Sequence, residues 1–253
     1  MLLITSCSKE SSNKNQNPFN SDYNIFLGDS VFKVKQFDVY WENVDTFILD
    51  NRNFLEYDNG NRLIKTRSIN YLPSGNIDDS IIHTFKYVGN LIIDNEYYEN
   101  ILIGRIVHVV DQDYFSLRDT IYGQGNIPGT IELQEIIVYT YNEIHNIVSE
   151  EFKIAKRTET NIWISGNLTE KLYYSGSSDK FKFTTSVNKN YKGDFFNFGR
   201  YNLNNKLEDS LANSNVVHYD YTIEPDGFLK AEIKTTFLPN MIKSNCKKTI
   251  YYK

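Results

Sequence analysis

The feature of this 253-residue sequence that most constrains its fold is a Gly-Asn pair that occurs five times. The pairs are Gly60-Asn61, Gly75-Asn76, Gly89-Asn90, Gly125-Asn126 and Gly166-Asn167. Both residue types accept the positive φ that a tight hairpin requires. A Leu or Ile follows each pair at once or after one residue, which suits the start of a returning strand. The pattern predicts a chain that repeatedly folds back on itself.

Aromatic residues separated by one position lie upstream of several turns. They are Phe85 and Tyr87, Tyr139 and Tyr141, and Tyr219 and Tyr221. Such spacing places both rings on one face of a strand. Residues 229–237 alternate largely apolar with polar or charged side chains, as a half-buried strand does. No long segment has a clear helical period; the nearest, residues 31–49, is equally compatible with two strands.

These units predict an all-β fold, a single large antiparallel meander built from repeated hairpins. A flat sheet of about a dozen strands would expose too much apolar surface. We therefore expect the sheet to curl into an open half-barrel or a barrel-like sheet. No linker composition interrupts residues 21–253, which predicts one β domain there and leaves residues 1–20 as a separate segment.

The separate segment contains Ile4-Thr5-Ser6-Cys7, which resembles the lipobox of bacterial lipoproteins. A polar tract without aromatic residues follows from Ser8 to Asn17, as expected of a flexible tether. The apolar part is shorter than a usual signal peptide and no basic region precedes it. We interpret residues 1–20 as a truncated lipoprotein signal and tether, with the true start codon upstream. The prediction is that Cys7 is lipidated and anchors the chain to the outer membrane; the alternative is an ordinary cysteine in a cytosolic protein.

The turn units themselves resemble the YD-type repeats of RHS-like proteins, in which an aromatic-x-aromatic group precedes a short gap and Gly-x-Leu. The matching segments are 57–63, 141–147 and 221–228. With the N-terminal segment, the chain is similar to uncharacterised outer-membrane lipoproteins of Bacteroidota that carry degenerate repeats. The resemblance implies a large curled antiparallel sheet, a periplasmic or surface location and no known activity. Irregular spacing over 91–125 and 168–218 leaves the number of strands open.

No catalytic or metal motif stands out in the sequence. The four His residues lie apart from one another, and Gly123-Gln124-Gly125 has no following helix to hold a phosphate. If Cys7 is acylated, Cys246 is the remaining thiol, and no internal disulfide forms. The sequence therefore predicts no enzyme activity, metal or cofactor. A net charge of −5 without a concentrated basic face argues against a nucleic-acid partner.

Two tryptophans, Trp41 and Trp163, are the candidate ligand-binding residues. Flat rings on an exposed sheet stack on sugars, and a concave aromatic face holds a peptide or lipid; the alternative for both is core packing. The leading hypothesis is a monomeric, lipid-anchored envelope protein that acts as a non-catalytic binding or scaffold module. The alternatives are a carrier of an apolar ligand inside the curled sheet and a glycan hydrolase with two carboxylates from distant strands.

Overall fold

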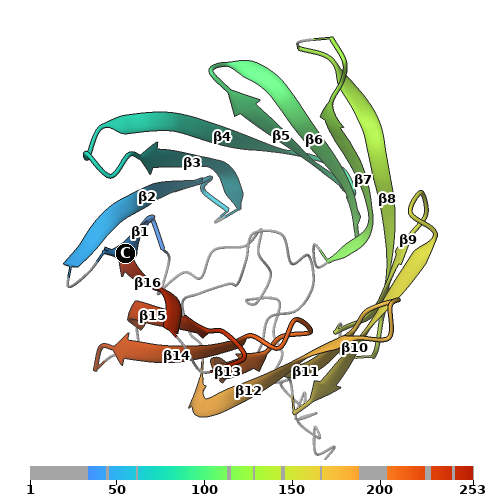
Figure 1. Ribbon diagram of the computed structural model, residues 1–253. Coiled ribbons are helices and arrows are strands. Elements are labelled where there is room, and N and C mark those ends of the chain that lie inside the picture. The colour runs from blue at the N-terminus through green and yellow to red at the C-terminus, as the bar shows by residue number, and fades with distance from the viewer. Residues whose placement is uncertain are drawn as a thin grey trace, which may run out of the picture.

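The structure, a computed structural model, describes residues 34–43, 46–60, 62–112, 115–127, 129–143, 146–165, 167–187, 204–225, 229–240 and 243–252. This part of the chain folds into sixteen strands that form one closed antiparallel barrel (Figure 1). The first eight are β1 Gln36–Asn43, β2 Thr46–Tyr57, β3 Leu63–Tyr71, β4 Ile77–Val88, β5 Leu91–Tyr98, β6 Ile101–Val110, β7 Ser116–Gln124 and β8 Ile131–Tyr141. The second eight are β9 Ile147–Phe152, β10 Arg157–Ile164, β11 Asn167–Leu172, β12 Ser178–Val187, β13 Asn204–Ser210, β14 Val216–Ile223, β15 Leu229–Phe237 and β16 Lys243–Tyr252.

The barrel is an up-and-down meander in which each strand pairs with its neighbours along the chain. The sheet closes where β1 pairs with β16, from Gln36 opposite Tyr252 to Trp41 opposite Lys247. The predicted all-β curled meander is confirmed, and closure, which the sequence left open, removes both sheet edges. Residues 31–49 contribute β1 and the start of β2 rather than a helix. The boundary between residues 1–20 and 21–253 lies outside the described residues and stays a prediction.

Three Gly-Asn pairs, at 75–76, 89–90 and 125–126, lie between strands as the sequence predicted, whereas Asn167 begins β11 and Asn61 and Gly166 lie outside the described residues. Gly89-Asn90 alone connects β4 to β5, and Gly75 lies in the β3–β4 connection; the two glycines have φ of 59° and 83°. Gly therefore provides the positive φ in these turns. Where the Gly-Asn spacing lapses, Glu99-Asn100 connects β5 to β6 with φ of 49° and 66°, the dihedral pattern of a type I′ hairpin.

In longer connections, the Asp or Asn position of the YD-like units accepts hydrogen bonds from the backbone. Asp58 follows β2 and accepts a hydrogen bond from the backbone N–H of Arg62 at 2.9 Å. Asn142 follows β8, and its side-chain oxygen accepts from the N–H of Asn146 at 3.0 Å. An Asp or Asn in this position satisfies backbone donors that would otherwise lack partners.

Because partners in an antiparallel pair share a face, the register sorts the side chains into an inner and an outer set. We call the end where β1 begins and β16 ends the terminal end. The inner face at this end carries two clusters of buried apolar residues, which we call the inner apolar belt. One cluster comprises Ile92, Val110, Tyr139 and Ile147; the other comprises Val34, Leu55, Leu63, Leu229 and Tyr251.

Aromatic side chains tie neighbouring hairpins together at the same end. The Tyr57 hydroxyl donates to the carbonyl oxygen of Val34 at 3.2 Å, and that of Tyr87 donates to Leu63 at 2.7 Å. The hydroxyl of Tyr141 donates in the same way to the carbonyl of Ser116. The repeated aromatic pairs of the sequence therefore have a common structural role, because they fill the belt and bridge successive hairpins.

The described part of the chain contains no helix that is long and apolar enough to cross a membrane.

Candidate functional site

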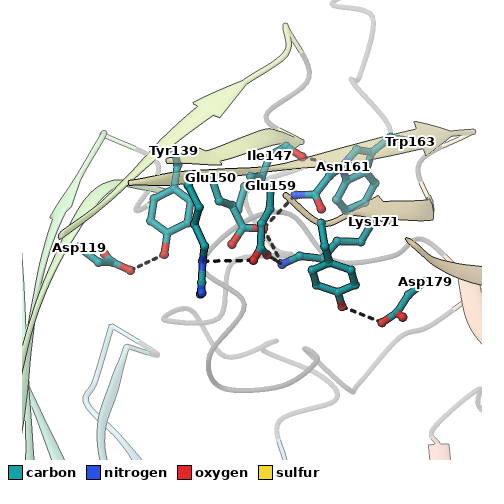
Figure 2. A network of polar contacts seen from close by, with 11 residues as sticks. Asp119, Tyr139, Ile147, Glu150, Glu159, Asn161, Trp163, Lys171 and Asp179 are labelled. Carbon is teal, nitrogen blue, oxygen red and sulfur yellow. Dashed lines mark hydrogen bonds and ion pairs between the residues drawn. The ribbon is translucent and has the colours of Figure 1, made fainter. Parts of the chain in front are cut away.

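Polar side chains occupy the inner face next to the inner apolar belt, and Figure 2 shows a large part of them between β7 and β12. The register puts them on one face, and the picture shows those that it labels pointing into the space that the strands enclose. We call this set the inner polar belt. Its members are His83, Asp94, His108, Asp119, Glu150, Glu159, Asn161, Lys171, Asp179 and Asp209.

The most deeply buried part of the inner polar belt is centred on Asp119. The Asp119 carboxylate accepts hydrogen bonds from Nδ1–H of His108 at 2.7 Å, from the Tyr139 hydroxyl at 2.8 Å and from the Ser116 hydroxyl. Asp119, His108 and Ser116 are each 0% exposed. The serine donates to the aspartate and not to the imidazole, so the order of contacts differs from that of a hydrolytic triad.

A second cluster on β9, β10 and β11 surrounds Lys171. Glu150 and Glu159 are cross-strand partners, and the Lys171 ammonium lies 3.0 Å from an oxygen of each. Asn161 donates to Glu150 at 3.0 Å. Burial by itself lowers the pKa of Lys171, but the charges and hydrogen bonds of the two glutamates outweigh it, and the pKa is raised.

In the described barrel, the Glu150–Glu159 pair is the arrangement that the glycan hydrolase hypothesis would assign as the two catalytic carboxylates. Glycoside cleavage needs one carboxyl to donate a proton, and enzymes raise the pKa of that acid by apolar or negatively charged surroundings. Here one ammonium bridges both carboxylates. The arrangement holds charges in place and does not resemble an acid–base pair.

His83 on β4 and Asp94 on β5 form a third contact, with Nδ1 3.0 Å from the carboxylate. Burial alone lowers the pKa of His83, but the hydrogen bond and charge of Asp94, with the charge of Glu96, raise it above its usual value of 6.5. The protonated imidazole is therefore favoured in the folded barrel.

This contact predicts a pH dependence of stability. Because the pKa of His83 is higher in the folded barrel than in the unfolded chain, the contact contributes its full stabilisation below pH 6.5. That contribution is lost as the pH rises through the folded pKa. We expect the free energy of unfolding to fall over that window in the wild type and to fall less in His83→Gln. Urea unfolding at a series of pH values measures the difference, and equal slopes in both proteins would contradict it. His218, on the outer face, provides the control substitution His218→Gln.

The structure places the sequence-predicted residues apart. Trp41 lies on the inner face of β1, where the Lys247 ammonium is 3.9 Å from its ring centroid. Trp163 lies on β10, seven strands away around the shorter arc, and its Nε1–H donates to the carbonyl of Ile147 at 2.7 Å. The two tryptophans do not form one site. Their ligand-binding role stays a prediction, and Cys7 lies outside the described residues.

Sequence reasoning missed the inner polar belt. Its members come from different strands, and each looks like an isolated polar residue in the sequence. One signal was available: the alternation that places Phe85 and Tyr87 inward continues to His83. Among the described residues no group of three His, Cys, Asp or Glu side chains is placed to hold a metal ion.

The outer face also carries charge near the middle of its strands. Arg52, Arg105 and Lys182 each lie three positions from an inward residue on the same strand, so they point outward. Arg52 pairs with Asp38 at 2.7 Å, and Arg105 donates to Asn95 at 2.7 Å. Lys182, which is 66% exposed, contacts Glu208 at 2.6 Å on the neighbouring strand. Charged groups therefore lie on both faces of the wall.

The fold has a counterpart among solved structures. A porin-like protein from Bacteroides uniformis superposes with a TM-score of 0.63 and 8% sequence identity over 87% of this chain and 96% of that chain. The two proteins share a fold. A porin-like protein from Bacteroides vulgatus matches over 87% of this chain and 98% of that chain at 11% identity, with a TM-score of 0.32. No family model matches the sequence, and no curated protein matches it either.

Proposed function

We propose that this chain is a lipid-anchored protein of the bacterial cell envelope whose barrel is a non-catalytic binding module for a hydrophilic ligand. In this proposal Cys7 carries the anchor to the outer membrane and the barrel wall faces water on its outside. The observation that carries the proposal is the presence of charged side chains on both faces of the wall.

The outer charges argue for a barrel that does not cross the bilayer. A membrane-spanning barrel presents an apolar band about 25 Å tall, and an outward Arg or Lys near the bilayer midplane costs about 2–4 kcal/mol. Arg52, Arg105 and Lys182 lie near the middle of β2, β6 and β12, which are spread around the circumference. No single orientation in a bilayer would keep all three side chains out of the hydrocarbon region.

The inner polar belt argues for a hydrophilic ligand over an apolar one. An apolar ligand that covered Glu150, Glu159 and Lys171 would separate them from water without replacing its hydrogen bonds, which costs free energy. Barrels of sixteen or more strands are wider than their wall side chains alone fill. A polar solute that hydrogen-bonds to these groups suits the wall better than the apolar cargo of the carrier alternative.

The anchor is tested by cell fractionation of protein expressed behind an intact lipoprotein signal peptide with labelled palmitate. We expect wild type to carry the label and to stay with the outer membrane after a carbonate wash. Cys7→Ala is expected to lose the label and to move almost wholly to the soluble fraction, because the proposed anchor is then missing. Ser8→Ala, which changes a neighbouring residue, is the control.

Two results would overturn the proposal. Absence of label on the wild-type protein would remove the lipid anchor. Retention of folded Cys7→Ala in the washed membrane would show that the barrel wall itself is held in the bilayer.

A further inference from the structure

A row of inner side chains crosses β14, β15, β16 and β1, and two strands separate it from the Lys171 cluster. The row runs Tyr219, Lys234, Lys247, Trp41, and successive members are direct cross-strand partners. It therefore contains two cations side by side with an aromatic ring at each end. The Lys234 ammonium lies 5.8 Å from the Tyr219 ring centroid, and that of Lys247 lies 3.9 Å from the Trp41 centroid.

The two lysines are unusual among the inward basic side chains. His83, His108, Arg157 and Lys171 each lie within 4 Å of a carboxylate. Lys234 and Lys247 have no carboxylate within that distance in the part of the chain that the structure describes. Like charges that face each other across two strands are destabilising, so this pair weakens the free barrel.

The surroundings of Lys247 confirm that its charge is poorly compensated. Burial lowers its pKa, Asp50 opposes this at a distance beyond ion-pair contact, and Lys234 lowers it further. An anion bound between the two ammonium groups would relieve both effects. Trp41 and Tyr219 would then flank that anion with flat apolar surfaces.

We propose that Lys234 and Lys247, with Trp41, form a binding site for an acidic saccharide. Ammonium groups recognise the carboxylate or sulfate group, and an aromatic ring packs against the apolar face of a sugar. The proposal rests on the proposed function, because it specifies the hydrophilic ligand of the barrel. It assigns Trp41 a role in ligand recognition and leaves Trp163 a structural role in the wall, where its indole N–H donates to the carbonyl of Ile147.

The test is isothermal titration of the purified full chain with trigalacturonate, a sulfated galactose trisaccharide and neutral galactotriose. We expect one or both acidic sugars to bind and the neutral sugar to bind at least tenfold more weakly. Lys247→Gln and Lys234→Gln should each weaken acidic-sugar binding about tenfold, the size of one charge-assisted hydrogen bond. Trp41→Leu should weaken it as well, and added salt should reduce it.

Lys248→Gln is the matched control, since Lys248 is the next residue on β16 and lies 5.7 Å over the Phe47 ring on the outer face. It should leave binding unchanged. Thermal unfolding of each variant verifies that the barrel is intact. Equal binding of neutral and acidic sugars, no binding of any sugar, or an unchanged affinity in Lys247→Gln would overturn the site. Cell fractionation of Cys7→Ala reports on the anchored barrel independently of these outcomes.

Discussion

Replacing Asp119 with alanine is expected to lower the free energy of unfolding by about 3–5 kcal/mol, the cost of removing one partner from a buried charged contact. Asp119 is fully buried and accepts hydrogen bonds from His108, Ser116 and Tyr139. Alanine leaves these three donors in the protein interior without their acceptor. Each buried donor that loses its partner adds its own desolvation cost.

Chemical denaturation monitored by tryptophan fluorescence and by circular dichroism measures the effect of Asp119→Ala. Asp78→Ala is the control, because Asp78 lies exposed on β4 and its replacement should change stability by less than about 0.5 kcal/mol. Asp119→Asn should fall between the two, since an amide keeps one acceptor oxygen and loses the negative charge. If Asp119→Ala and Asp78→Ala have the same free energy of unfolding, the cluster around Asp119 does not stabilise the barrel as its contacts indicate.

The turns and the strand type were predictable because they depend on neighbouring residues. Gly89-Asn90 needs only its own backbone preferences, and Phe85 and Tyr87 share a face whatever surrounds them. Closure was not predictable in this way, since it depends on Gln36 meeting Tyr252 at the other end of the described chain. The number of strands decides whether those two edges meet, and several connections lack the Gly-Asn signal.

The polar sites were harder to predict from the sequence than the turns and strands were. Lys171 meets Glu150 because β9, β10 and β11 are in one register, and that register shifts at a bulge between Ile162 and Trp163. A slip of one residue would reverse the face of every side chain in the strand. Trp41 and Trp163 look equivalent as sequence features, yet Trp41 lies beside the Lys247 ammonium and Trp163 donates to a backbone carbonyl.

The fold of a barrel and the medium around its wall are separate properties, and the distribution of charge bears on the second. A shared fold describes how the strands are connected, whereas the medium around the wall is determined by the outward side chains. Arg52 and Lys182 lie on the same strands as the inward residues Leu55 and Asp179. The same strands therefore carry polar groups on the inner wall and charged groups on the outer wall.

The last expectation concerns the inner apolar belt, where Ile92→Ala should lower the free energy of unfolding by about 2–5 kcal/mol. Ile92 is 0% exposed and packs in one cluster with Val110, Tyr139 and Ile147. Truncation removes buried methyl groups and leaves a cavity that a closed sheet cannot collapse, because hydrogen bonds on both sides of β5 hold its backbone in place.

Ile101→Ala provides the comparison within the same hairpin, since Ile101 begins β6 and is 46% exposed. It should cost less than about 1 kcal/mol, because the apolar area that it buries is small. Urea unfolding of both variants measures the two losses under one set of conditions. Similar losses would mean that the belt at the terminal end contributes no more than the exposed rim, and that the repeated aromatic and aliphatic residues do not hold the barrel together.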